Sequence, residues 1–97
     1  MSHYFIVYEL NKQLAGTLLA EFWSDYVSLH IVIVDKKYRY KGIGQALLDF
    51  FDEEVKKRKI KLIEVLIEED NSLMKKIIKK RGYKKGKLFR YFVRVIK

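Results

Sequence analysis

Runs of apolar residues separated by short polar turns predict three strands in the first third of the chain. Residues 4–10 are aromatic and β-branched, and the polar residues 11–13 that follow are typical of a turn. A second strand is predicted over residues 14–23, where Gly16 indicates a β-bulge or a close approach of another backbone. A third strand is predicted over residues 26–34. Connections this short favour antiparallel pairing.

The third predicted strand has two chemically different faces. One face is wholly apolar and is expected to pack on a helix: Val27, Leu29, Ile31 and Ile33. The other face turns polar toward its start and comprises Ser28, His30, Val32 and Val34. We expect this second face to look toward a substrate cleft.

Helix and strand patterns alternate in the rest of the chain. A helix that begins at residues 42–44 is predicted by apolar residues at helical spacing. These apolar residues are Leu47, Leu48, Phe51 and Val55. A fourth strand is predicted over residues 61–67. The pair Asn71-Ser72 is a good N-cap for a second helix, and Gly82 can end that helix in the left-handed conformation. A last strand is predicted over residues 88–96.

These elements predict a single domain over residues 1–97. The expected fold class is α/β (α+β) with a mixed, mostly antiparallel sheet. Its elements follow in the order strand, strand, strand, helix, strand, helix, strand. No repeat and no linker rich in Pro, Ser or Gly divides the chain.

Composition narrows the classes of function. The chain has no Cys, and therefore offers no disulfide, thiol nucleophile or Cys-based zinc site. His3 and His30 are its two histidines, so we expect no metal site. The longest apolar runs are far too short to span a membrane, and the first residues do not resemble a signal peptide. We therefore expect a cytoplasmic protein with no membrane partner.

Positive charge is concentrated in the last quarter of the chain. The net charge is +9, but residues 1–70 hold 10 basic and 12 acidic groups, whereas residues 71–97 hold 11 basic groups and no acidic one. A local run of cations also lies within residues 36–41. This distribution predicts a polyanionic partner, and charge alone does not separate a nucleotide phosphate from a nucleic-acid backbone. Solubility is the alternative explanation for the C-terminal lysines.

The candidate chemistry lies between the third strand and the first helix. Gly42 and Gly44 open the helix, where glycine lets the backbone approach an anion and N–H groups at the helix start attract negative charge. Arg39 and Lys41 add full positive charges. These features predict a pyrophosphate site. A P-loop is excluded because no Gly-Lys-Ser/Thr follows, and Leu47 stands where a Rossmann fingerprint needs a third small residue.

The same segment resembles the acetyl-CoA loop of the GNAT acyltransferases. Arg39-Tyr40-Lys41-Gly42-Ile43-Gly44 matches the family pattern Q/R-x-x-G-x-G/A. Gly16 is similar to a glycine that the family often has in the preceding strand. Asn71, eleven residues before Gly82-Tyr83, resembles the family's N…G-F/Y segment. The resemblance covers residues 4–83.

This resemblance implies that acetyl-CoA is the co-substrate and that its acetyl group moves to an amine by direct attack on the thioester. The main chain of Val32, Ile33 and Val34 would pair with the pantetheine arm. Asn71 would contact the cofactor further along. The backbone that would hold the pyrophosphate comprises Arg39, Tyr40, Lys41, Gly42, Ile43, Gly44 and Gln45.

The chain departs from the family where an acid and a base are usual. Ile78 stands where members often have a Tyr, and Ser28 and Leu66 stand where some have a Glu base. His30 is the best remaining candidate for a general base, because an imidazole titrates near neutrality. The alternative for His30 is a half-buried strand histidine with a structural hydrogen bond. Weaker candidates in the region are Glu68, Tyr26 and Glu21.

A second class of function stays open beside the enzyme. The missing acid and base favour a non-catalytic GNAT-fold module that binds CoA or a polyanion such as nucleic acid, through the basic residues 75–97. The family's two N-terminal helices have no counterpart before residue 4, so the acceptor site is expected to be open or completed by a second copy. Because residues 4–10 and 14–23 are apolar on both faces, we expect a homodimer that covers the bare face.

Overall fold

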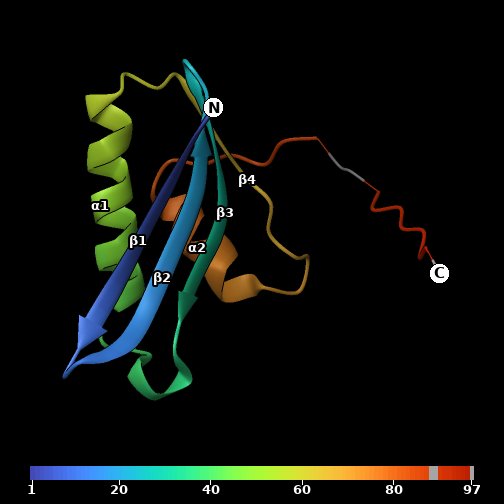
Figure 1. Cartoon of the computed structure of the whole chain (residues 1–97). Helices are drawn as coiled ribbons and strands as arrows, with labels where there is room; N and C mark the ends of the chain where they lie inside the picture. Colours follow the sequence, from blue (N-terminus) through green and yellow to red (C-terminus); the bar gives the residue numbers. More distant parts are fainter. Residues whose placement is uncertain (88–89, 97) are drawn as a thin grey trace. The chain divides into compact units, whose positions relative to one another are not determined.

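The computed structural model describes residues 1–87 and 90–96. Its backbone forms two compact units, residues 1–66 and 67–97. The first unit contains a four-stranded sheet and a long helix (Figure 1). Its elements are β1 (Ser2–Leu10), β2 (Gln13–Phe22), β3 (Tyr26–Val34), the 3₁₀-helix η1 (Lys36–Tyr38), α1 (Ile43–Lys57) and β4 (Leu62–Val65). The second unit contains α2 (Ser72–Lys80).

The strands lie in the sheet in the order β1-β2-β3-β4. β1 pairs with β2 and β2 with β3 in antiparallel fashion, and β3 pairs with β4 in parallel. The predicted α/β (α+β) fold with a mixed, mostly antiparallel sheet is therefore confirmed. Asn11 and Lys12 form a two-residue turn between β1 and β2 with φ values of 53° and 63°. Tight hairpins commonly need this left-handed conformation at both turn residues.

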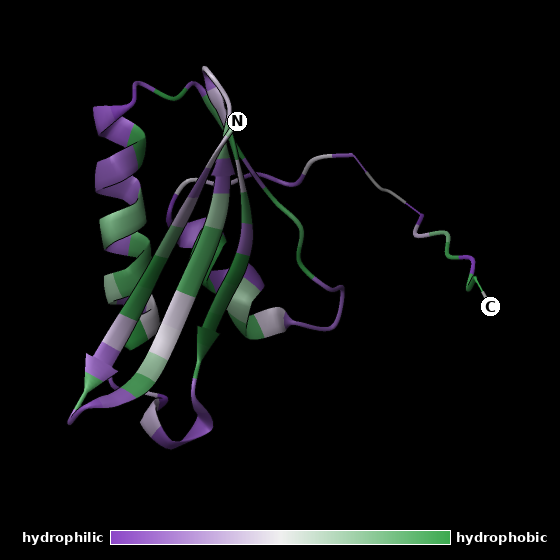
Figure 2. Cartoon of the chain, viewed as in Figure 1, coloured by the Kyte–Doolittle hydropathy of each residue, from purple (hydrophilic) through white to green (hydrophobic). Residues whose placement is uncertain are grey.

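The core of the first unit lies between α1 and one face of the sheet. α1 contacts β1, β2 and β3. The buried side chains come from both layers and include Leu18, Ala20, Phe22, Val27, Leu29, Leu47, Leu48 and Phe51. The predicted stripe on the helix is thus the side that α1 turns toward the sheet, and hydrophilic residues occupy much of the rest of α1 (Figure 2).

A β-bulge at His30 changes the predicted faces of β3. The register of β2 against β3 shifts by one residue at this point, and His30 is the extra residue. An extra residue reverses the inward and outward alternation beyond it. The prediction that Ile31 and Ile33 belong to the helix-packed face is therefore wrong, and they are 37% and 56% exposed. Val32 and Val34 take their places, as ladder partners of β2 residues that face α1.

Gly16 lies where the start of α1 packs against the sheet. A register shift between β1 and β2 makes Ala15 an extra residue beside it. A Cβ placed on Gly16 would lie 3.1 Å from the carbonyl oxygen of Ile33, from Cγ2 of Ile43 and from Cδ1 of Leu47. Gly16 therefore adjoins a bulge and permits a close backbone approach, and both predictions for it are confirmed.

We expect Gly16→Ala to lower the free energy of unfolding by about 1–3 kcal/mol, the usual cost of overpacking. The carbonyl oxygen of Ile33 belongs to the backbone and cannot swing away from an added methyl group as a side chain can. Chemical denaturation measures the effect. Gly86→Ala is the matched control, since a Cβ at that position meets nothing within 4 Å. An unchanged denaturation midpoint for Gly16→Ala would contradict the prediction.

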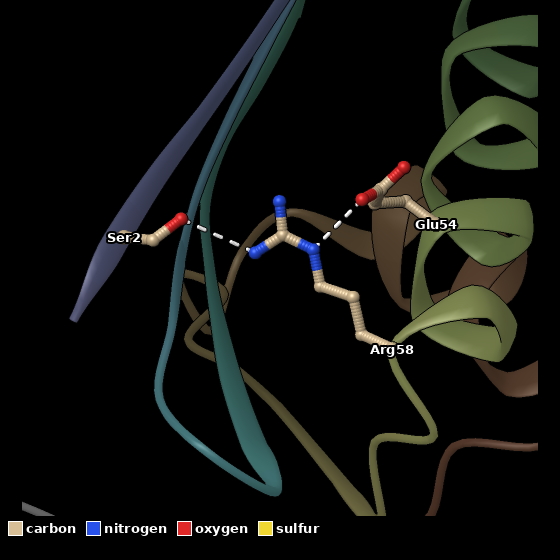
Figure 3. Close-up of polar contacts among 3 residues, drawn as sticks. All are labelled: Ser2, Glu54 and Arg58. Atoms are coloured by element: carbon tan, nitrogen blue, oxygen red, sulfur yellow. Dashed lines mark hydrogen bonds and ion pairs between the residues drawn. The ribbon is translucent and has the colours of Figure 1, made fainter.

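Arg58 joins the end of α1 to the start of the sheet (Figure 3). Its Nε donates a hydrogen bond to Oε2 of Glu54 at 2.7 Å, and its Nη1 donates to Oγ of Ser2 at 3.2 Å. Its guanidinium carbon lies 4.0 Å from the ring centre of Phe22, in a cation–π contact. Burial raises the pKa of the nearby Tyr4, the Glu54 carboxylate adds to this effect, and Arg58 opposes it. One side chain thus links the helix, the first strand and the core.

The second unit is built around α2. Asn71 caps the helix, because its Oδ1 accepts a hydrogen bond from the backbone N–H of Met74 at 3.2 Å. Gly82 follows the helix with a φ of 93°, in the left-handed conformation that commonly ends helices. Both predicted boundaries of this helix are confirmed.

The predicted last strand over residues 88–96 is not found. Residues 90–96 form no strand, and residues 88 and 89 lie outside the described residues. Tyr91 and Phe92 are 84% and 86% exposed. A strand needs a neighbouring backbone to complete its hydrogen bonds, and α2 is the regular element in the described part of this unit. The aromatic and β-branched composition of this segment therefore led to a wrong prediction of a strand.

Candidate functional site

The loop after β3 is held by hydrogen bonds that the sequence did not indicate. The N–H of Asp35 donates to the carbonyl oxygen of Ala15 at 2.8 Å. Oδ1 of Asp35 accepts a hydrogen bond from the N–H of Lys37 at 2.9 Å. Tyr38 is buried, and its hydroxyl group donates to Oε1 of Gln13. The loop is therefore fixed to the sheet at its backbone and through a buried ring, which is how scaffolds position binding loops.

α1 begins at Gly42 without a capping side chain. Gly42 has a φ of 78°, a conformation that glycine adopts without the strain a side chain would add. The first turn of α1 contains no acidic residue. The backbone N–H groups of that turn and the helix dipole therefore create a positive potential that no carboxylate within the turn opposes.

Cationic side chains stand on the same loop, and they are Lys36, Lys37, Arg39 and Lys41. The Nε of Arg39 donates to the carbonyl oxygen of Val34 at 3.2 Å. The ammonium groups of Lys37 and Lys41 lie 5.6 and 5.9 Å from the ring centre of Tyr38. Figure 2 shows that this loop is mostly hydrophilic. Full charges and the helix start together favour an anion at this position.

The parallel ladder between β3 and β4 ends just before the bulge. It runs from the pair Tyr26–Leu62 to the pair Leu29–Val65, whereas β3 continues to Val34. Residues 32–34, which the resemblance assigns to the pantetheine arm, lie in this continuation. On the β4 side, this stretch of β3 has no strand partner among the described residues. It is therefore an open backbone edge that leads to the cationic loop.

His30 and Glu21 meet on the face of the sheet opposite α1. The Nε2 of His30 lies 2.9 Å from Oε1 of Glu21, and the two side chains are 40% and 27% exposed. His30 is the bulge residue and follows Leu29, the last β3 residue paired with β4. The sequence prediction named His30 and found nothing that singled out Glu21. The bulge, which sequence reasoning missed, places the two together.

A row of polar residues crosses three strands beside this pair. Glu21 is the ladder partner of Ser28, and Ser28 is the partner of Glu64, so that the three share one face. The Tyr26 hydroxyl donates to Oε1 of Glu64 at 2.8 Å, and this hydrogen bond raises the pKa of Tyr26. The sequence did not indicate Glu64, because its position beside Ser28 depends on the parallel register of β3 against β4. The face opposite α1 thus carries two carboxylates near the open edge.

Asn71 lies in the second unit, where it caps α2. Its Oδ1 accepts the capping hydrogen bond. The side-chain amide nitrogen of Asn71 is a donor that this capping bond does not use, and the cofactor role of Asn71 stays a prediction. The capping role explains the residue type without any ligand.

Across residues 1–87 and 90–96, no cluster of three or more His, Asp or Glu side chains is arranged to hold a metal ion. In the same described residues, no helix is long and apolar enough to cross a membrane.

Known proteins resemble this chain in sequence and in fold. Residues 1–85 match the family model of the acetyltransferase (GNAT) domain. The uncharacterized protein YxbD of Bacillus subtilis (strain 168) is 33% identical over 79 residues, which are 81% of this chain and 48% of that protein. The chain therefore spans about half the length of this curated relative.

Two solved structures share the fold. The ribosomal-protein-S18-alanine N-acetyltransferase from Escherichia coli has a TM-score of 0.84 and 20% identity, over 88% of this chain and 55% of that one. The PaiA N-acetyltransferase from Thermoplasma acidophilum, solved in complex with coenzyme A, has a TM-score of 0.78 and 22% identity, over 84% and 52%. The solved structures show a shared fold, whereas the family model matches the sequence itself over residues 1–85. The chain therefore belongs to the GNAT acetyltransferase family.

Proposed function

We propose that the chain binds acetyl-CoA and transfers its acetyl group to an amine. The observation that carries this proposal is the junction between β3 and α1. There an open strand edge, a loop rich in cations and an uncapped helix start follow one another along the backbone.

The parts of acetyl-CoA match this junction in order. The pyrophosphate would accept hydrogen bonds from N–H groups at the start of α1, beside Arg39 and Lys41. The pantetheine arm is an extended chain with two amide groups, and it would pair with residues 32–34 as an added strand does. The thioester would then lie toward the bulge at His30. The coenzyme A in the Thermoplasma acidophilum neighbour supports this choice of ligand.

The reaction at the thioester exchanges one bond for another. The amine nitrogen bonds to the acetyl carbonyl carbon, the carbon–sulfur bond breaks, and the CoA thiolate leaves. Backbone N–H groups at the open edge of β3 would polarise the carbonyl oxygen as charge develops on it. Holding the amine and the thioester side by side supplies much of the rate. One proton must also leave the amine.

Isothermal titration of the purified chain with acetyl-CoA and with CoA tests this proposal. We expect micromolar dissociation constants for both, followed by thioester consumption when a primary amine is added. The absence of binding would overturn the proposal. Binding without consumption by any amine would favour the non-catalytic module instead.

We also propose that two copies of the chain associate through the sheet face opposite α1. Four large apolar side chains on that face are at least one third exposed: Phe5, Val7, Ile31 and Ile33. Burying them against a second copy would remove this apolar surface from water. We expect a dimeric mass at high micromolar concentration by sedimentation equilibrium. Phe5→Ser should shift the mass toward the monomer, and a monomeric wild-type chain would contradict the proposal.

A further inference from the structure

The bulge residue His30 lies where a reacting group would be needed. It follows Leu29, the last β3 residue with a partner in β4, and precedes the open edge of residues 32–34. If the pantetheine arm runs along that edge from the cationic loop, its thioester end points toward His30. The inference below rests on the proposed function in this respect.

Glu21 sets the protonation pattern of the His30 ring. An ionised carboxylate is only an acceptor of hydrogen bonds, so the nitrogen that faces it carries a proton. Here that nitrogen is Nε2, at 2.9 Å from Oε1 of Glu21. In the neutral ring, the lone pair then lies on Nδ1. The side chain of His30 is 40% exposed, so the ring is accessible from solvent.

The charge of the surrounding face favours a cationic acceptor. Glu21 and Glu64 lie in one row across the sheet, with Ser28 between them. Amines are mostly protonated near neutral pH, and two carboxylates on one face attract such a cation. The acceptor would therefore arrive on the face opposite α1 at this polar row, beside and not over the apolar patch that the proposed dimer covers, and meet the thioester at the bulge.

We propose that His30 is the general base of the acetyl transfer and that Glu21 is its positioning residue. The bound ammonium first loses one proton to solvent, which frees the lone pair of its nitrogen. Nδ1 of His30 then takes a second proton from the attacking neutral amine as the carbon–nitrogen bond forms. The carbon–sulfur bond breaks at the same centre, and the proton on the imidazolium passes to solvent or to the CoA thiolate. Glu21 stabilises the imidazolium and holds the ring orientation, and touches neither reactant.

The test measures acetyl transfer to putrescine, a small primary diamine, together with acetyl-CoA binding by titration. We expect His30→Gln to lower kcat by about 100-fold or more, the usual contribution of a general base. Its affinity for acetyl-CoA should stay within about two-fold. Glu21→Gln should lower kcat by about ten-fold, because its amide can still orient the ring but cannot neutralise the imidazolium. Added imidazole should restore part of the activity of His30→Ala, which a purely structural role would not allow.

His3→Gln is the matched control. His3 is the ladder partner of Glu21 on β1, carries the same ring, and lies away from the open edge. We expect its kcat to stay within about two-fold of the wild type, in line with the small effects of surface substitutions. Unchanged kcat in His30→Gln would overturn the inference. Wild-type protein that binds acetyl-CoA and leaves putrescine unmodified would overturn it too, while the cofactor proposal would stand. A failure to bind acetyl-CoA would instead contradict the proposed function.

Discussion

Replacing Gly44 with aspartate is expected to abolish measurable CoA binding while the fold stays intact. Gly44 is the second residue of α1, and a Cβ there would make an ordinary contact of 3.5 Å with Cγ2 of Val34. A carboxylate in the first turn interacts favourably with the helix dipole, so stability should not fall. The same carboxylate repels a bound pyrophosphate. At roughly 5 Å and an effective dielectric constant of about 20, one such charge pair costs ~3 kcal/mol, more than about 100-fold in affinity.

Gly44→Ala is the control for this experiment. It fills the same space without a charge, and its affinity for CoA should stay within a few-fold of the wild type. Calorimetric titration and thermal unfolding are measured on both variants. If Gly44→Asp bound CoA as tightly as the wild type, the start of α1 would not be the phosphate site.

Phe51→Ala is expected to bring the chain close to unfolding. Phe51 is fully buried, and its ring centre lies 6.1 Å from that of Phe22 in the core between α1 and the sheet. Truncating a buried Phe costs about 3–5 kcal/mol, out of the roughly 5–15 kcal/mol that stabilises a typical domain. The melting temperature should fall by more than about 12 °C at this chain length.

The neighbouring Phe50 provides the control for this stability experiment. Phe50 is 61% exposed, so Phe50→Ala should change the free energy of unfolding by less than about 0.5 kcal/mol. Urea unfolding of the two variants gives the comparison directly. Equal effects would mean that α1 does not bury the face assigned to it.

Residue propensities and hydrophobic periodicity predicted most elements of the first unit, because residues close together in the sequence determine where these elements begin and end. The turn at Asn11 and Lys12, the bounds of β3 and the helix start at Gly42 all follow from residue types close together in the sequence. The loop proposed to hold the pyrophosphate is equally local, since Gly42, Gly44 and the cations before them are contiguous.

The features that could not be predicted depend on register between distant segments. The bulge at His30 arises where β2 and β3 pair, and no residue type within β3 marks it. The pairing of His30 with Glu21, and the position of Glu64 beside Ser28, follow from that register and from the parallel ladder to β4. The last strand was overpredicted for a related reason, because residues 90–96 have strand-like composition and no strand to pair with among the described residues of their own unit.

Because His30 is an extra residue in β3, the strand can lose it by a one-residue deletion and still pair with β2. Deleting His30 would remove the extra residue and restore simple alternation along β3, so that Ile31 and Ile33 would turn inward and Val32 and Val34 outward. All four residues are apolar and β-branched, so that the shortened strand would still present a hydrophobic face to α1. The loss of one codon could therefore leave a foldable sheet with no base at its open edge. Evolution can remove the proposed chemistry from this fold in a single step, and can restore it by a single insertion.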